Sequence, residues 1–152
     1  MRITKENIHE FIEGSSMDCS NKGITHIEYI PDGITRLDCN NNKLTELPKL
    51  PNSLIGLFCE DNKLTELPKL PDGLKYLYCH NNKLTELPKL PESLIGLYCG
   101  DNKLTELPIL PNSLIGLYCY GNNNLPYKIT IKNLKQHNTL IKRKQILKRI
   151  CG

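Results

Sequence analysis

The feature that most constrains the fold of this chain is a segment that recurs every twenty residues. In its middle copies the repeat reads L-x-x-L-x-C-x-x-N-x-L-x-x-L-P-x-L-P. Its cysteine recurs at that interval in six successive places, at Cys19, Cys39, Cys59, Cys79, Cys99 and Cys119. A fixed period in this range is typical of a solenoid. One unit cannot bury its own leucines, so the repeat predicts stacked units that share one continuous core.

Within each unit, the spacing predicts one strand and one extended return. Leu57 and Cys59 alternate with Phe58 and Glu60, which is the period of a strand with one face inward. Strands of successive units should then pair in parallel, ~4.8 Å apart. The return LTELPKLPNS contains prolines that lack an amide donor and restrict the residues before them. We therefore expect an extended, polyproline-like return without a regular α-helix.

These motifs resemble the leucine-rich repeat family. The resemblance covers residues 19–126, about five to six units. Its LPxLP return and short unit are similar to the bacterial-type class found in effector proteins of pathogens. The abundance of Asn, Lys and Ile also resembles that of leucine-rich repeat proteins of giant amoebal viruses. The resemblance implies a leucine-rich repeat solenoid with a parallel β-sheet on its concave face and extended returns on its convex face.

The repeated cysteines occupy a position where the family places an inward leucine. We interpret them as a core ladder, because free cysteine often behaves as a small buried apolar residue. The ladder consists of Cys39, Cys59, Cys79, Cys99 and Cys119. The alternative is a column of metal ligands. Tetrahedral binding needs donors that converge on one point, whereas a parallel ladder spreads them along a line. We therefore expect no metal and no cofactor.

A second column consists of asparagines three residues after each of these cysteines. Its members are Asn42, Asn62, Asn82, Asn102 and Asn122. The chain must turn there, and its backbone groups need hydrogen-bond partners. The resemblance implies that each asparagine side chain bonds backbone groups of its own unit and of the adjacent one. We assign this asparagine ladder a structural role.

Both ends of the chain depart from the repeat, and we expect them to act as caps, because a stack exposes its core at its ends. Residues 1–18 are predicted to form a helical cap, with Thr4 as the N-cap and Gly14 after the helix. Residues 127–152 are predicted to form a second cap. It would begin with a strand over 127–131 and continue as a basic amphipathic helix.

The charge of the chain is unevenly distributed. The net charge is +4, yet none of the 16 acidic residues follows Glu106, whereas eight of the 20 Lys and Arg residues do. On the predicted C-terminal helix, Leu134 and Ile141 share a face, as do Leu140 and Leu147. The basic stretch is interpreted as the solvated side of a cap. The alternatives are an address signal, a contact with nucleic acid or an anionic membrane through the tail 128–149, or a helix that meets a partner.

No group of residues has the pattern of a catalytic site. The sequence contains no glycine-rich phosphate loop, no GxSxG and no HExxH. His80 should point away from Cys79, because neighbouring residues of a strand face opposite sides. In the effectors that the chain resembles, ligase activity belongs to a separate C-terminal domain. About 26 residues follow the repeats here, too few for such a domain, so we expect no enzyme activity.

The cysteine content favours an intracellular location. Seven cysteines without a CxxC pair fit a reduced setting better than a disulfide framework. The N-terminus lacks the apolar core of a secretory signal, and no run approaches the ~20 apolar residues of a transmembrane segment. We expect a cytoplasmic protein, in a host cell if it acts as the effectors do.

The candidate binding residues are the outward positions of the concave sheet. Phe58, Tyr78, Tyr98 and Tyr118 fall on successive strands and predict an aromatic stripe roughly 15 Å long. A neighbouring column varies from unit to unit and contributes Glu60, His80 and Tyr120. Aromatic side chains anchor many protein interfaces, so we predict a protein partner of unknown identity here. Aromatics also suit strands on propensity alone, which leaves a column that merely covers the sheet as the alternative.

Overall fold

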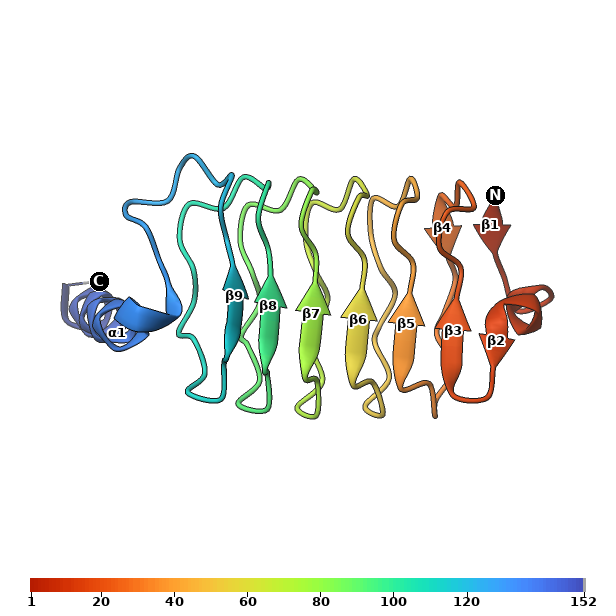
Figure 1. Ribbon diagram of the computed structural model, residues 1–152, viewed down its shortest axis with the longest axis horizontal. Coiled ribbons are helices and arrows are strands. Elements are labelled where there is room, and N and C mark those ends of the chain that lie inside the picture. The colour runs from red at the N-terminus through yellow and green to blue at the C-terminus, as the bar shows by residue number, and fades with distance from the viewer. Residues whose placement is uncertain (152) are drawn as a thin grey trace.

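The repeats stack side by side into one solenoid in the computed structural model, which describes residues 1–151 (Figure 1). The main sheet has seven strands in the order β2-β3-β5-β6-β7-β8-β9. The strands of the repeats are β3 (Ser16–Asp18), β5 (Arg36–Asp38), β6 (Gly56–Phe58), β7 (Tyr76–Tyr78), β8 (Gly96–Tyr98) and β9 (Gly116–Tyr118). All of these pair in parallel, as the sequence predicts.

The pairing register equals the sequence period. Leu37 lies opposite Leu57, Leu57 opposite Leu77, and Leu77 opposite Leu97, a step of twenty residues each time. Met17 of β3 takes the same place beside Leu37. Every position of the repeat therefore forms a straight column along the solenoid. Since side chains alternate along a strand, each column faces either the core or the open face of the sheet.

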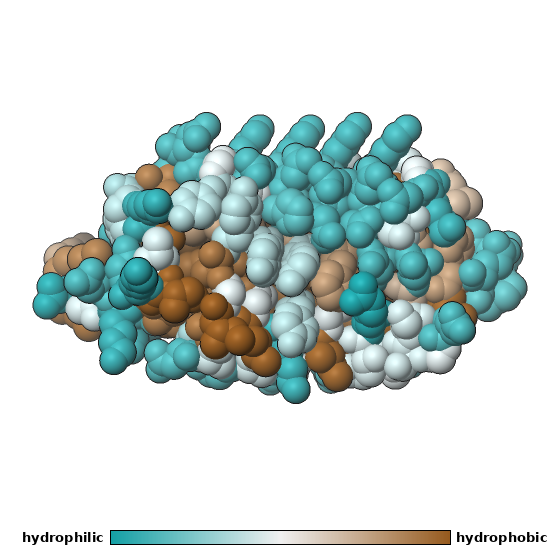
Figure 2. Space-filling view, in the orientation of Figure 1, coloured by the Kyte–Doolittle hydropathy of each residue, from teal (hydrophilic) through white to brown (hydrophobic). Residues whose placement is uncertain are grey.

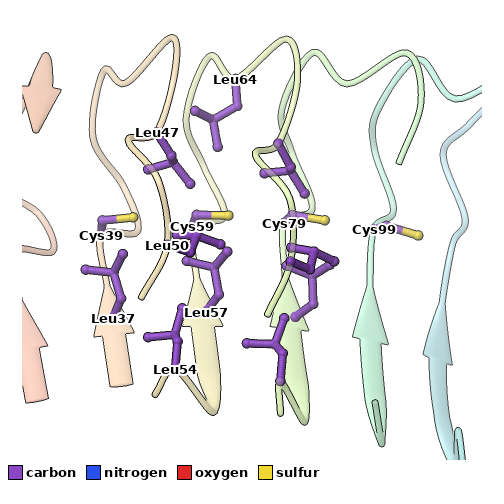
Figure 3. Close-up of a cluster of buried hydrophobic side chains, with 14 of the residues drawn as sticks. Leu37, Cys39, Leu47, Leu50, Leu54, Leu57, Cys59, Leu64, Cys79 and Cys99 are labelled. Atoms are coloured by element: carbon purple, nitrogen blue, oxygen red, sulfur yellow. The ribbon is translucent and has the colours of Figure 1, made fainter. Parts of the chain in front are cut away.

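The core lies between the sheet and the returns and contains the cysteine column. Cys39, Cys59, Cys79 and Cys99 stand at the same height in successive rungs (Figure 3), and none of them has exposed surface. Burial raises the pKa of the Cys19 thiol to about 12 and also raises the pKa values of the four thiols after it well above their usual range. These thiols stay protonated at neutral pH and fill the core as apolar groups.

The asparagine column joins each rung to the one before it. The Asn62 side-chain amide donates to the carbonyls of Cys39 and Cys59, at 3.0 and 3.2 Å. Its Oδ1 accepts from the Leu44 amide at 3.0 Å. The same bridging bonds are made by Asn42, Asn82, Asn102 and Asn122. These bonds satisfy backbone groups that would otherwise be buried without partners.

The turns and returns follow from single residue types. Asp61 and Gly121, at one position of the repeat, have φ of 54° and 78°, a conformation open to Gly, Asn and Asp but costly for most residues. The return over residues 63–71 contains neither helix nor strand, as its prolines predict. Its leucines Leu64 and Leu70 are buried, so the return closes the core opposite the sheet.

The N-terminal cap contains less helix than the sequence predicts. Strand β1 (Arg2–Ile3) pairs in parallel with β4 (His26–Ile27), the 3-10 helix η1 covers Ile8–Phe11, and β2 (Ile12–Glu13) pairs antiparallel with β3. The residue before η1 is Asn7, so the prediction of Thr4 as N-cap is wrong. The Asn7 side chain instead accepts a hydrogen bond from the Thr4 amide at 2.8 Å, which holds 4–7 in a turn.

At the C-terminal end, the predicted strand over 127–131 is absent. After β9 the chain crosses the end of the core and enters the 3-10 helix η2 (Ile131–Asn133) and the helix α1 (Leu134–Cys151). Ile129 is buried, and the Tyr127 hydroxyl lies 2.8 Å from His137 Nδ1 of α1. The contacts of this segment with α1 and the core are more favourable than a strand, although its residues alternate as in a strand. Gly152, the last residue of the predicted cap, lies outside the described residues.

Helix α1 docks on the return side of the last repeat and not on the sheet. Asn138 accepts from the Leu110 amide at 2.8 Å and donates to its carbonyl at 2.7 Å. His137 Nε2 lies 2.9 Å from the Pro108 carbonyl oxygen, and Lys144 pairs with Glu106 at 2.6 Å. Leu134 and Ile141 are buried on this side. The outward side of α1 is also apolar, with Leu140, Ile146, Leu147 and Ile150 exposed.

Candidate interaction surface

The open face of the sheet carries a continuous line of aromatic rings, here called the aromatic row. It consists of Phe58, Tyr78, Tyr98, Tyr118 and Tyr120. The first four end successive strands, and their ring centroids lie 5.0, 4.4 and 6.2 Å apart. The Tyr118 and Tyr120 rings follow at 5.5 Å. These are distances of direct ring contact, so the five side chains form one surface.

A cation lies at each end of the aromatic row. The Arg36 guanidinium sits 4.0 Å from the Phe58 ring centroid and also pairs with Asp38 at 3.0 Å. At the far end, Lys128 Nζ lies 5.1 Å from the Tyr120 ring centroid. Cations over ring faces are attracted by the ring quadrupole. The row is therefore bounded by positive charge at both ends.

Glycines beside the row let the rings lie flat on the sheet. A Cβ on Gly56 would come 2.8 Å from the Phe58 ring, and one on Gly116 would meet the Tyr98 ring at 3.7 Å. At the other side of the row, the Tyr118 ring occupies the space above Gly100. Phe58, Tyr78 and Tyr98 are half-buried as a result. Burial also raises the pKa of Tyr78, so its hydroxyl stays a neutral donor.

The exposure of the row increases toward the C-terminal end. Tyr118 and Tyr120 are 36% and 48% exposed, in contrast to the half-buried rings before them. Ring stacking and glycine contacts account for the inner rings as a sheet covering. Tyr118 also lies over Gly100 and against Tyr98, yet both outer tyrosines keep apolar surface that faces solvent.

Next to the row, Glu60 and His80 form a polar pair of positions on consecutive rungs. Burial raises the pKa of the Glu60 carboxyl, and Asn40 donates to its Oε1 at 3.4 Å. Within residues 1–151, Glu60 Oε2 and His80 Nδ1 are buried without a hydrogen-bond partner. Buried polar atoms without partners are uncommon in folded proteins. Because neither atom has exposed surface, both lie beneath the open face and not on it.

An isoleucine column on this surface was missed by the sequence reasoning. It consists of Ile55, Ile95 and Ile115, one residue before the strands β6, β8 and β9. Ile55 is 42% exposed and Ile115 is 78% exposed. Figure 2 shows apolar surface gathered on the visible face around β8 and β9. The signal was a repeated isoleucine, but strict alternation from Leu57 assigns this position to the core.

The remaining candidates show no convergent chemistry. Cys79 faces the core, whereas His80 lies on the open side. Among the described residues, no group of three His, Cys, Asp or Glu side chains is placed to hold a metal ion. No helix within residues 1–151 combines the length and apolar character needed to cross a membrane.

The chain matches no known protein-family model and no curated protein. Among solved structures, it is similar to YopM from Yersinia enterocolitica WA-314, with a TM-score of 0.65 and 40% identity over 67% of this chain and 23% of that one. It is also similar to the leucine-rich repeat domain of a Shigella effector, with a TM-score of 0.69 and 34% identity over 76% of this chain and 52% of that one.

A third similar structure is YopM from Yersinia pestis, a leucine-rich effector protein, with a TM-score of 0.53 and 32% identity over 67% of this chain and 36% of that one. This chain thus spans between about a quarter and a half of the proteins it resembles. The solenoid of parallel rungs and the C-terminal helix agree with these structures. The chain has the leucine-rich repeat fold, and the solved structures that it resembles are bacterial effectors.

Proposed function

We propose that this chain is a non-enzymatic interaction module that binds a partner protein through the open face of its sheet, the predicted concave face. The observation that carries the proposal is the outer end of the aromatic row. There Tyr118 and Tyr120 expose apolar surface side by side at the end of β9, and Ile115 exposes further apolar surface just before the start of the same strand. Tyrosine and clustered apolar side chains are typical anchors of protein interfaces.

The polar part of the face supplies the means for selectivity. Glu60 Oε2 and His80 Nδ1 have no partner within the described residues, and they lie toward the N-terminal side of the exposed rings. Both atoms are covered by the chain itself, so a side-chain movement must uncover them before a partner can bond to them. A partner that supplies a donor to the carboxylate and a polar atom to the imidazole then gains these bonds, and a partner without such groups does not. The face thus combines apolar residues that anchor a partner with polar groups that select among partners.

We further propose an intracellular site of action, in a host cell if the chain works as the effectors that it resembles do. All seven cysteines are free thiols, which suits a reducing compartment. The similarity to effector structures supports the same placement.

Site-specific photo-crosslinking tests the main proposal. A photoreactive residue at position 118 reports on the sheet face, and one at Lys69 reports on the return face. We expect one partner to crosslink from position 118 and not from position 69. Tyr120→Ala combined with Ile115→Ser should remove that partner, whereas Lys69→Ser should not. Equal crosslinking from both faces would refute binding at the sheet.

A second candidate function involves the basic C-terminal tail, 128–149, which we propose as a contact for nucleic acid or an anionic membrane. Its supporting observation is α1, which has no acidic residue and whose only ion pair among the described residues joins Lys144 to Glu106. Outward Leu147 and Ile150 add exposed apolar surface. Basic helices with such a face bind anionic lipid surfaces, and basic clusters alone bind nucleic acid.

Charge substitution tests the tail without removing the cap. Deleting α1 would uncover Leu107 and Leu110 of the last repeat, so a truncated chain is a poor probe. Lys142→Gln combined with Lys148→Gln should weaken retention on heparin and lower its salt dependence. Lys63→Gln combined with Lys83→Gln, in the repeats, is the matched control. Equal retention of both double variants would reject the tail as a polyanion site.

A further inference from the structure

The main sheet ends at β9 with an edge that nothing pairs. In the interior, the Ile95 carbonyl accepts hydrogen bonds from the amides of Ile115 and Gly116, at 2.9 and 3.1 Å. The Cys99 amide donates to the Tyr118 carbonyl at 2.8 Å. One rung further, the equivalent groups are the Ile115 carbonyl and the Cys119 amide. Within the described residues, neither has a backbone or side-chain hydrogen-bond partner.

The side chains at this edge are exposed where their counterparts are not. Leu37, Leu57, Leu77 and Leu97 have no exposed surface, whereas Leu117 at the same position is only partly buried. Ile115 is 78% exposed, against 42% for Ile55. The edge therefore lacks both the backbone and the apolar side chains that a following rung supplies to every inner strand.

The C-terminal segment covers only the Cys119 end of this edge, where the Cys119 thiol donates to the Ile129 carbonyl at 3.4 Å. Residues 127–131 form no strand, and α1 contacts the returns through Leu110, Pro108 and Glu106. A hollow of about 400 Å³, lined in part by Tyr120, Asn122 and Lys128, remains where the chain leaves β9. The cap covers the return half of the last rung and leaves the sheet half open.

We propose that a single extended segment of the partner protein adds to this edge as an eighth strand of the main sheet. This inference rests on the proposed sheet-face function and specifies how the partner binds. The segment accepts from the Cys119 amide, donates to the Ile115 carbonyl, and places an apolar side chain on Leu117. Strand addition to an open edge is an established mode of peptide recognition. The incoming strand lies directly beside Tyr118.

The shape of the molecule favours one strand over a second copy of this chain. Helix α1 lies farther out along the long axis than β9 (Figure 1). Two solenoids that approached edge to edge would therefore meet at their α1 helices first. A lone strand needs only ~4.8 Å beside β9. At the opposite edge, β2 is two residues long and carries Glu13, which are features that discourage strand addition.

The chain itself supplies the probe. A fluorescent peptide with the sequence of residues 53–62 has the strand of a following rung, so its Ile55 and Gly56 amides should face the Ile115 carbonyl. We expect saturable binding by fluorescence anisotropy under reducing conditions. N-methylation of those two amides should weaken binding at least about tenfold, because it removes the donors but keeps the side chains. N-methylation at Cys59, whose amide faces away in the rung, is the control.

Protein variants and hydrogen exchange complete the test. Ile115→Lys at the edge should weaken peptide binding at least about tenfold, whereas Ile55→Lys, beside a strand paired on both sides, should not. Exchange of the Cys119 amide should slow when peptide is bound. Undetectable binding, equal binding of both methylated peptides, or a concentration-dependent dimer that the peptide dissociates would each overturn the inference. Partner crosslinking from position 118 that persists in such a case leaves the sheet-face function standing.

Discussion

The two ends of the solenoid finish the same repeat in different ways. At the N-terminal end, β2 turns back as an antiparallel strand, and Met17 beneath it has no exposed surface. At the C-terminal end, no strand follows β9 within residues 1–151, and Leu117 is only partly buried. The first end covers the core and ends the sheet in the short antiparallel strand β2. The second closes the returns with α1 and leaves the sheet open.

The difference shows that capping a stack involves two separate tasks. One is to cover apolar side chains, which a helix such as α1 does through Leu134 and Ile141. The other is to satisfy the backbone edge, which needs a strand or a deliberate obstacle. The N-terminal cap covers Met17 and reduces the edge of the sheet to the two-residue strand β2, which carries Glu13. Because the C-terminal cap does only the first, the edge of β9 stays unpaired within residues 1–151.

Thiol labelling tests the comparison with the largest expected contrast. Burial gives Cys19 a pKa of about 12, so only about one Cys19 thiol in ten thousand is ionised at pH 8. We expect a disulfide reagent to label Cys151, which is exposed, orders of magnitude faster than Cys19. Cys119, 5% exposed at the open end, should react second. Mass spectrometry of native samples measures the order, and reaction of Cys19 before Cys119 would contradict the closed N-terminal end.

Truncation of the apolar residue at each end compares the two cores in energetic terms. Met17→Ala removes a side chain without exposed surface and should lower the free energy of unfolding by about 2–5 kcal/mol. Leu117→Ala should cost less than ~2 kcal/mol, because part of that side chain already faces water. Urea denaturation followed by circular dichroism gives both values. Equal costs would mean that the last rung is as well covered as the first.

The caps can be compared through one asparagine each. Asn138→Ala removes both hydrogen bonds to Leu110 and should cost about 1–2 kcal/mol. Asn7→Ala removes bonds to the Thr4 amide and the Arg2 carbonyl at a more exposed site, so it should cost less than ~1 kcal/mol. Thermal unfolding of both variants ranks them. A larger loss of stability for the Asn7 variant would contradict the expectation that the Asn138 bonds stabilise the chain more.

We expect two carboxyl groups to give the stability of the chain small pH dependences of opposite sign. Hydrogen bonds from Ser20 lower the pKa of Asp18 near the N-terminal end, so its stabilising contribution is present above its unfolded-state pKa and is lost as pH falls through the folded one. Burial raises the pKa of Glu60, so its contribution is full below the unfolded-state pKa and is lost as pH rises through the folded one.

Melting temperatures measured against pH separate these effects. Asp18→Asn should destabilise the chain at neutral pH and should reduce the loss of stability in acid. Glu60→Gln should raise the melting temperature slightly at neutral pH, because it removes a partly desolvated charge. Glu60→Gln that lowers the melting temperature at neutral pH would show that the carboxylate is satisfied by the fold.

The middle of the fold was predictable because one physical requirement repeats there. Leucines such as Leu57 and Leu77 must lie opposite each other to be buried, which sets register, strand direction and columns together. The prolines of the return, such as Pro68, excluded a helix by local chemistry alone. The position of the aromatic rings on the open face followed from the same alternation, while their role in binding stays a prediction.

The ends were harder because each occurs once. Residues 127–131 have the alternation of a strand, yet Tyr127 contacts His137 of α1. The position of α1 relative to this segment cannot be read from the local spacing of residues. Thr4 is a good helix cap by type, but Asn7 closes a local turn first. The isoleucine column was missed for a related reason. Strict alternation from Leu57 would point Ile55 into the core, but Ile55 precedes β6, where the backbone is outside the strand.

The identity of pairing register and sequence period has a consequence for size. Since every inner rung meets its neighbours through the same bonds, a whole unit can be inserted or deleted between Asn62 and Asn82 without altering either cap. Such a change lengthens or shortens the open face of the sheet by one strand. Duplication of a unit can therefore change the area of this face while both ends of the solenoid keep their structure.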